Sequence, residues 1–497
     1  LIELILLNSN LIYGVVFKYP LYFGGTDTFA HIYYSQIVLL TGHSIPPQLD
    51  PAYAYFSCYH ILISITSQIL NQNISDSLFK VTSVLYIIQL IFLYYIVFNL
   101  INNKQIALFS CFFYSSLAST IYYSYYIVPR AVVFVFFIIL LYLWVKDKSH
   151  FRFLGLIFSA AIVLFHSASI VQFLFILFLI VLLERAFNIK IIITLPSLVF
   201  LLVIFMSYWF YVATDFSHSI ISHLLKTENV REITFVQPSI DITVFFKDHI
   251  SMGILLFFVL LGVMYTLKKP SYLTIIGILT MILLLFYLPN PVKMATQVLE
   301  LFGFYRFELF SSPFIAIMAG AGFVLFLNSF SKSNQMRIGL SLTFILISVM
   351  IFASITTTSN ASDFNKMTQS NFFTDSDLDT ISFIEGNTYS NVTLYSDYFM
   401  YRAFSPKQSY ETTSDYSPIK LKSYNADIIY DVESIYNNKG YTIFRKNEFE
   451  KASFLLFGST ENIYSLSYTP QNNINLTNAL LSSNKIYQSD KNDIFYR

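Results

Sequence analysis

Long apolar runs alternate with short polar segments along the first 357 residues of the chain, and the remainder is polar. A helix that crosses a membrane needs about 20 mostly apolar residues, and the runs recur at about that length. This pattern predicts an α-helical polytopic membrane protein. The candidate spans cover residues 1–17, 52–70, 79–100, 106–126, 128–145, 151–165, 168–183, 191–212, 252–267, 272–288, 307–327 and 338–355.

Basic residues in the short connections indicate the side of the membrane that each connection faces. Lysine and arginine are concentrated in KDKSHFR (146–152), ERAFNIK (184–190), LKKP (267–270) and SKSNQMR (331–337), so we expect these loops to be cytoplasmic. Successive spans put successive loops on opposite sides of the membrane. Counted back from these loops, the polar segment after residues 1–17 is external only if residues 52–70 do not cross the membrane.

The composition of residues 52–70 favours a helix that lies in the outer interface. The segment follows a Pro-Pro pair and carries Tyr53, Tyr55, Tyr59, His60 and Gln68, which is typical of an aromatic, half-hydrated helix. We therefore expect about eleven spans. Residues 18–78 then form an external first loop with juxtamembrane helices, within a transmembrane domain of residues 1–357.

The polar C-terminal part, residues 358–497, is predicted to be a small external α/β domain. DLDTISFIEG (377–386) has the pattern of a helix with a glycine at its end. VTLYSD, ADIIYD and YTIFRK have the composition of short strands, and the closing NKIYQSDKNDIFYR is typical of a hairpin.

Composition supports the membrane assignment and narrows the function. The chain is 55% hydrophobic and 12% charged, with a net charge of +1 and two cysteines, so we expect no nucleic-acid partner and no disulfide framework. The predicted spans carry almost no charge near their centres, which argues against an ion-coupled transporter. The polar residues gather on the predicted external side, as in an enzyme with a lipid-borne substrate, or in a receptor-like or scaffold subunit.

The stretch YFGGTDTFAH follows the first apolar run and contains the strongest candidate for catalysis. Gly24 and Gly25 allow a sharp turn, and Asp27 and His31 are four residues apart, so they share one face of a helix. A carboxylate beside an imidazole at a membrane edge suits a general base. The alternative is that Asp27 only caps the helix, in which case no arginine is expected across the groove.

Several basic side chains are candidates for binding an anionic substrate. Arg306, in ELFGFYRFELFSSP, and Lys293 lie where an external loop meets a span, and Arg130 follows Pro129 at the start of another. An arginine there binds a lipid phosphate through paired hydrogen bonds or simply lies at the interface. His31, His60 and His166 are further candidate substrate contacts. The alternative for His31 is that it orients Asp27, and the alternative for His166 is a helix-end role.

The N-terminal span, the Gly-Asp loop, the juxtamembrane helix and the segment IPPQLDPAYAYFSCYH together resemble the GT-C superfamily of membrane glycosyltransferases. That superfamily includes oligosaccharyltransferase catalytic subunits, protein O-mannosyltransferases and aminoarabinose transferases. The resemblance covers the overall layout and is sharpest over roughly the first 130 residues and around Arg306.

The resemblance implies a role for each candidate. Asp27 matches the first-loop aspartate of the family and would be the catalytic base, with a sugar on a polyprenyl phosphate or diphosphate as donor and Arg306 binding that phosphate. Many relatives carry a second acidic residue in the second external loop, where YSYYIVPRAVV offers Arg130 instead. This departure favours a metal-independent inverting mechanism, with a divalent Mg²⁺ or Mn²⁺ ion as the open alternative.

We therefore predict a glycosyltransferase of the plasma membrane that acts on the extracytoplasmic side. Its partners would be a lipid-linked sugar, membrane lipids, and a protein, glycan or lipid acceptor. The competing hypotheses are a non-enzymatic scaffold or assembly subunit with an external docking domain and, with less support, a transporter.

Overall fold

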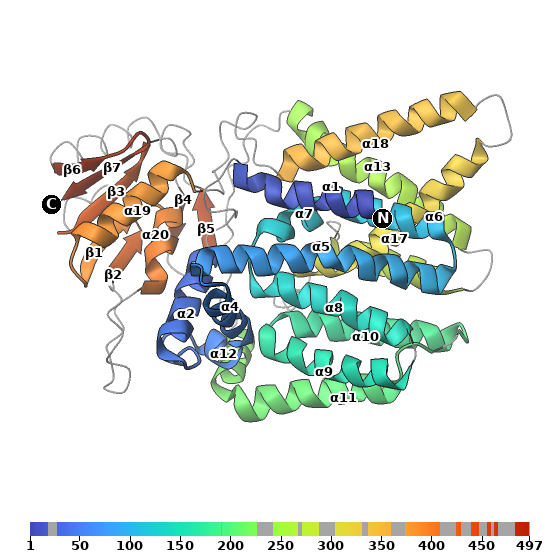
Figure 1. Cartoon of the computed structure of the whole chain (residues 1–497), viewed down its shortest axis with the longest axis horizontal. Coiled ribbons are helices and arrows are strands. Elements are labelled where there is room, and N and C mark those ends of the chain that lie inside the picture. The colour runs from blue at the N-terminus through green and yellow to red at the C-terminus, as the bar shows by residue number, and fades with distance from the viewer. Residues whose placement is uncertain are drawn as a thin grey trace.

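The structure is a computed structural model, and it describes most of the chain. The described residues are 1–17, 27–146, 148–189, 191–225, 242–266, 271–287, 304–330, 336–358, 373–407, 424–428, 439–446, 455–458, 462–465 and 483–496. Long helices lie side by side in a bundle, and a smaller sheet-bearing domain lies at one end of that bundle (Figure 1).

The predicted apolar runs form the helices of the bundle. These are α1 (Ile2–Tyr13) with η1 (Gly14–Phe17), α5 (Ile74–Ile101), α8 (Pro129–Val145), α9 (Ser149–Phe165), α10 (Ser169–Ala186), α11 (Leu195–Ser207) with η2 (Tyr208–Val212), α13 (Ile242–Thr266), α14 (Tyr272–Tyr287), α17 (Phe304–Ser329) and α18 (Met336–Thr358).

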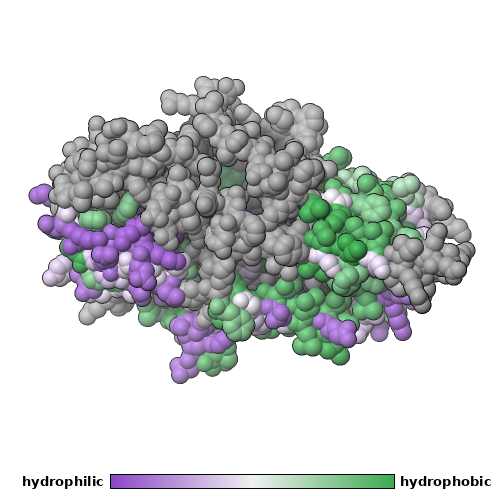
Figure 2. Space-filling model, turned by 90° about the horizontal axis from the view of Figure 1, so that it is seen from above, coloured by the Kyte–Doolittle hydropathy of each residue, from purple (hydrophilic) through white to green (hydrophobic). Residues whose placement is uncertain are grey.

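Among the described residues, four helices are long and apolar enough to cross a membrane, and a bent pair would be a fifth. The apolar stretches described in the other helices are 10–17 residues long, among them Ile250–Thr266 within α13 and Ser341–Ile351 within α18. A helical membrane protein is thus supported, while the number of spans and their sidedness stay predictions. Figure 2 shows mainly hydrophobic residues over the described part of the bundle and hydrophilic residues over the sheet domain.

The prediction of one continuous helix over residues 106–126 is wrong. The run forms α6 (Lys104–Ser116) and α7 (Ala118–Tyr125), which meet at an angle of 62°. Leu117 is extended between them, and the hydroxyls of Ser115 and Ser116 donate to the carbonyls of Cys111 and Phe113. Side-chain hydrogen bonds of this kind compete with the helical ladder and bend helices, which hydropathy alone does not register.

Residues 52–70 also form two helices instead of one. α3 (Pro51–Tyr55) is capped by Asp50, whose Oδ1 accepts from the Tyr53 amide at 3.0 Å, and α4 (Cys58–Leu70) follows after a break. α4 lies with α2 (Asp27–Thr41) and α12 (Thr214–Leu225) at the end of the bundle that carries the sheet domain (Figure 1).

α17 lies at the centre of the bundle, against α6, α13 and α14. Its approach to α13 depends on two glycines. A β-carbon at Gly322 would lie 1.9 Å from the carbonyl oxygen of Phe258, and one at Gly262 would lie 2.2 Å from that of Met318. Small residues at helix contacts allow such close backbone approach in membrane proteins, so this pair fixes how closely α13 and α17 pack.

The C-terminal domain carries a five-stranded sheet in the order β2-β1-β3-β7-β6. Strand β1 is parallel to β2 and β3, whereas β7 is antiparallel to β3 and β6. The described elements are α19 (Asp375–Asn387), β1 (Val392–Ser396), α20 (Tyr398–Phe404), η3 (Ser405–Lys407), β2 (Tyr424–Ile428), β3 (Tyr441–Arg445), β4 (Leu455–Gly458), β5 (Asn462–Ser465), β6 (Asn484–Gln488) and β7 (Asn492–Tyr496). The predicted helix, the strands VTLYSD and YTIFRK and the closing hairpin are confirmed. The described part of ADIIYD lies in β2, and its last three residues lie outside the described residues.

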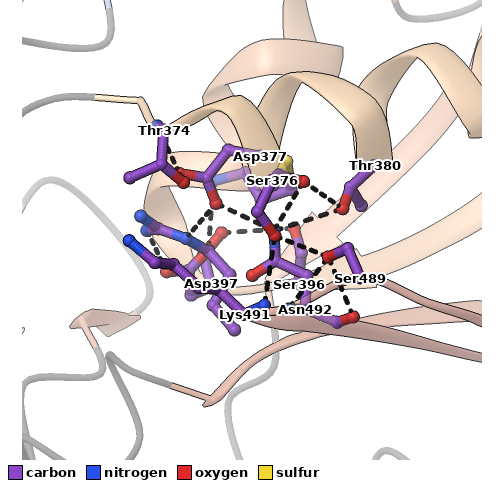
Figure 3. A network of polar contacts seen from close by, with 11 residues as sticks. Thr374, Ser376, Asp377, Thr380, Ser396, Asp397, Ser489, Lys491 and Asn492 are labelled. Atoms are coloured by element: carbon purple, nitrogen blue, oxygen red, sulfur yellow. Dashed lines mark hydrogen bonds and ion pairs between the residues drawn. The ribbon is translucent and has the colours of Figure 1, made fainter. Parts of the chain in front are cut away.

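A buried polar network joins this sheet to both of its helices (Figure 3). The Arg445 guanidinium on β3 binds Asp377 of α19 at 3.0 Å and Asp397 at 2.9 Å, and all three side chains are at most 4% exposed. Asn492 of β7 donates to Asp377 at 2.9 Å. Asp397 also accepts from the Met400 amide and thereby caps α20, so the network fixes where that helix begins.

Candidate active site

The carboxylate of Asp27 is the meeting point of three elements that are distant in sequence. Asp27 begins α2, and its Oδ2 accepts a hydrogen bond from the hydroxyl of Tyr126, directly after α7, at 2.6 Å. Its Oδ1 accepts from Nη2 of Arg402, on α20 of the sheet domain, at 2.7 Å. Both oxygens are thus held by side chains from other elements, and the Asp27 side chain is 47% exposed.

Local structure explains how these partners reach Asp27. The bend at Leu117 turns α7 away from the direction of α6. As a result Tyr126, directly after α7, lies beside Asp27 at the start of α2. The Asp397 cap fixes the first turn of α20, whose last turn carries Arg402. Phe29 of α2 packs edge-on against Phe373 of the sheet domain with ring centroids 4.6 Å apart, so an apolar contact accompanies the ion pair.

The Asp27–Arg402 ion pair lies in the wall of an open pocket of about 340 Å³. A second carboxylate, Asp50, lines the same pocket, and it accepts from the Tyr34 hydroxyl at 2.9 Å. The pocket therefore combines carboxylates, a guanidinium and phenol groups. Its lining residues are Asp27, Ala30, His31, Tyr34, Asp50, Tyr53, Tyr401, Arg402, Ser405 and Pro406.

Two histidines pair behind the pocket. Nδ1 of His31 and Nε2 of His60 are 3.0 Å apart, and the two residues are 1% and 0% exposed. The ring of Tyr53 packs edge-on against both imidazoles. Burial lowers the pKa of His31 to about 4, against the opposing charge of Asp27, and burial likewise holds the pKa of His60 well below its usual value. Both rings are therefore neutral at physiological pH, which lets one donate to the other.

The surroundings keep Asp27 ionised. Partial burial alone would raise the pKa of Asp27, but the Tyr126 hydrogen bond and the Arg402 charge outweigh it, so the pKa lies below the usual value. A carboxylate that is ionised, half-exposed and directed into a polar pocket can accept a proton from a bound group.

The structure brings some predicted site residues together and separates others. Asp27 and His31 line the pocket, and His60 contacts His31. Arg130 donates to the Tyr123 hydroxyl at 3.1 Å, and the ring of Tyr123 lies 6.1 Å from that of Tyr126. His166 accepts from the Ser169 amide at 3.1 Å at the start of α10, which matches its helix-end alternative.

The predicted phosphate-binding residues lie outside the described part. Lys293 and the side chain of Arg306 are both outside the described residues, although α17 includes position 306. The predicted convergence of Arg306 on Asp27 therefore stays a prediction. An arginine does face Asp27, as the helix-cap alternative for Asp27 did not expect, but it is Arg402.

Sequence reasoning missed Arg402, Tyr126 and Asp50. Tyr126 ends the tyrosine-rich stretch YYSYY, whose composition is typical of an aromatic belt at a membrane interface and does not indicate a contact with Asp27. Arg402 lies in YFMYRAF, directly after a predicted strand, where a helix can present side chains at the end of a parallel sheet. Nothing in the local pattern indicates that this helix docks on α2, because the two are far apart in the chain.

The described residues do not form a set of metal ligands. Among them, no group of three or more histidine, cysteine, aspartate or glutamate side chains is arranged to hold a metal ion. Asp27 is instead paired with the cationic Arg402.

No family model and no curated protein sequence matches this chain. Solved structures do match it. The apo oligosaccharyltransferase of Archaeoglobus fulgidus gives a TM-score of 0.58 at 11% identity, over 91% of this chain and 71% of that chain. ArnT from Cupriavidus metallidurans bound to undecaprenyl phosphate gives 0.53 at 10% identity, over 99% and 96%. The chain has the GT-C fold.

These matches confirm, for the fold, the resemblance to GT-C proteins that the layout of the sequence indicates. A third similar structure is the Archaeoglobus fulgidus oligosaccharyltransferase AglB in complex with an inhibitory peptide and a dolichol-phosphate, with a TM-score of 0.54 at 10% identity. The likeness to ArnT extends over nearly the whole of both chains, so the GT-C fold here includes the bundle and the C-terminal part.

Proposed function

We propose that this protein is a membrane glycosyltransferase that moves a sugar from a polyprenyl-phosphate-linked donor to an acceptor on the external face. The observation that carries the proposal is the half-exposed Asp27 carboxylate, which faces a polar pocket at the end of a GT-C bundle. Two of the similar solved structures contain dolichol-phosphate or undecaprenyl phosphate, which supports a lipid-linked donor here.

The proposed reaction uses Asp27 as the general base. Asp27 takes the proton of the acceptor nucleophile, which forms a bond to the anomeric carbon of the sugar. The bond from that carbon to the phosphate oxygen breaks on the opposite face, and its electron pair leaves with the lipid phosphate. The buried His31–His60 pair fixes the helix face that carries Asp27. Arg306, Lys293 and Arg130 remain proposed contacts of the phosphate.

Cells provide the direct test of this function. Lipid-linked sugars and surface glycans are compared by mass spectrometry in cells with the native chain, with Asp27→Asn, and without the chain. We expect one glycan to be lost, and its lipid-linked sugar to accumulate, in both altered strains. Identical profiles in all three strains would refute the transferase, and normal glycans in the Asp27→Asn strain alone would refute Asp27 as base.

The hydroxyl of Tyr126 is expected to set the pKa of Asp27, the proposed base. Tyr126→Phe removes the 2.6 Å hydrogen bond to Asp27, and a hydrogen bond to a charged group contributes about 1.5–3 kcal/mol. We expect the transfer rate to fall about 10- to 100-fold on the acid side of the pH–rate profile, because Asp27 is more often protonated there once the bond that favours its ionised form is lost. The acid limb of the pH–rate profile should move to higher pH, because the Tyr126 hydrogen bond lowers the pKa of Asp27.

Tyr122→Phe is the matched control for this prediction. The Tyr122 ring lies 5.0 Å from that of Tyr126 in the same cluster, but its hydroxyl is not a hydrogen-bond donor to Asp27. Equal effects of the two variants on rate and pH profile would show that packing of the cluster, and not the Asp27 contact, sets the activity.

A further inference from the structure

The Asp27–Arg402 ion pair joins two parts of the chain that lie 375 residues apart. Asp27 belongs to the first polar segment, and Arg402 belongs to the sheet domain. The adjacent contact of Phe29 with Phe373 holds the same two parts together. The sheet domain thus contributes Arg402 to the pocket. The Arg402 guanidinium forms an ion pair with Asp27, the carboxylate proposed as the base.

The charges of the pocket suggest that an anionic ligand and the Asp27 carboxylate compete for the Arg402 guanidinium. Among the described lining residues, Arg402 is the one permanently cationic side chain, and Asp27 and Asp50 are the carboxylates. His31 adds no positive charge because burial lowers its pKa to about 4. An anionic group that enters this pocket therefore competes with Asp27 for Arg402.

Resting on the proposed function, we propose that the phosphate of the lipid-linked donor takes the Arg402 guanidinium from Asp27, so that donor binding releases the base. A guanidinium suits this exchange, because its planar array of N–H donors binds carboxylate and phosphate in the same paired manner. The Arg402 side chain is 30% exposed and that of Asp27 is 47% exposed, so the exchange takes place in the pocket without opening the core.

The exchange couples donor binding to proton transfer. In the ion-paired state, Arg402 and Tyr126 together outweigh burial and lower the pKa of Asp27, which weakens it as a base. Once Arg402 binds the phosphate, burial is opposed mainly by Tyr126, and the proton affinity of Asp27 rises. The acceptor proton then moves to an Asp27 oxygen, and Arg402 stabilises the negative charge that the departing phosphate gains.

A cycle of binding measurements on the full-length protein in detergent tests the exchange. The probe is a polyprenyl phosphate, with the uncharged polyprenol and inorganic phosphate as comparison ligands. Asp27→Asn removes the competitor, so polyprenyl phosphate should bind about 5- to 20-fold tighter, equal to about 1–2 kcal/mol. Arg402→Gln should weaken binding, and the double variant should bind like Arg402→Gln, because the gain requires the guanidinium.

Asp50→Asn is the matched control for the loss of a negative charge. Asp50 lines the same pocket, where its oxygens accept from the Tyr34 hydroxyl and the Tyr53 amide, and asparagine retains the ability to cap α3. Its gain in affinity should be smaller and should persist with Arg402→Gln. Size-exclusion chromatography and Arg402→Lys, which keeps the charge but loses the planar fork, exclude misfolding as the cause.

Each outcome has a definite meaning. No gain with Asp27→Asn, or a gain that persists in the double variant, overturns the exchange. An equal gain for polyprenol also overturns it, and tight binding of inorganic phosphate alone assigns Arg402 to a free anion instead of a lipid. The glycan comparison tests the transferase separately. If glycans are lost but Asp27→Asn does not bind polyprenyl phosphate more tightly, the exchange is refuted and the transferase is not. If Asp27→Asn binds more tightly but no sugar is transferred by the native protein, the transferase is refuted.

Discussion

Asp27→Asn is expected to lower the rate of sugar transfer by about 10²- to 10⁴-fold, the usual contribution of a general base. Asparagine has nearly the same shape and can still accept the Tyr126 hydrogen bond, but it cannot take up the acceptor proton. The loss should therefore fall on kcat, with KM for the donor unchanged or lower. The measurement is steady-state transfer by the purified variant, with a lipid-linked sugar extract as donor.

Asp50→Asn provides the comparison in the same pocket. Asp50 is also a carboxylate of the lining, but its oxygens bind the Tyr34 hydroxyl and the Tyr53 amide, so it supports α3 rather than facing a reacting group. A loss confined to Asp27→Asn supports the base. Full activity of Asp27→Asn in a correctly folded protein favours the scaffold hypothesis, in which Asp27 only joins α2 to the sheet domain.

Arg445→Leu is expected to destabilise the C-terminal domain by about 3–5 kcal/mol, because it leaves the buried carboxylates of Asp377 and Asp397 without their cation. Since Asp397 also caps α20, the change should loosen the helix that presents Arg402. The measurement is urea unfolding of the full-length protein in detergent. Unfolding of the C-terminal domain is monitored by its susceptibility to proteolysis.

Lys446→Leu is the neighbouring control in the chain. Lys446 pairs with Asp493 at 2.9 Å, but its side chain is 28% exposed, so its loss should cost less than about 1 kcal/mol. Similar destabilisation by both variants would mean that general loss of charge, and not the buried network, accounts for the effect. A stable Arg445→Leu domain would contradict the assigned role of the network.

Acid should weaken the same domain. Burial raises the pKa of Asp377, but Arg445 and the surrounding hydrogen bonds more than compensate, so the folded-state pKa lies below the ordinary aspartate value of 3.8. A carboxyl with a lowered folded-state pKa contributes stability above its unfolded pKa and loses it as the pH falls through the folded value. When the pH is lowered below about 4, the urea concentration at the unfolding midpoint should therefore decrease. The decrease should be smaller in Asp377→Asn.

The elements with a strong local signal could be predicted from the sequence. Apolar runs of membrane length indicated the helices of the bundle, and the strands and hairpin of the C-terminal domain followed from alternation and turn residues. The two failures, at residues 106–126 and 52–70, share one cause. Hydropathy averages over a window, whereas a helix breaks where a few side chains compete for backbone hydrogen bonds or a residue leaves the helical conformation.

The site was only half predictable. Asp27 and His31 could be identified because four residues make one turn of a helix, so their common face is a local property. Tyr126 and Arg402 reach Asp27 across 99 and 375 residues, through the bend between α6 and α7 and the docking of α20 on α2.

The sequence by itself thus determined the membrane class, the GT-C resemblance and the carboxylate that begins α2. Only the tertiary structure decided what that carboxylate binds. The physical reason is that spans and helix faces follow from the periodicity of neighbouring residues, whereas the partners of Asp27 depend on how separate helices pack, which no local pattern of residues encodes.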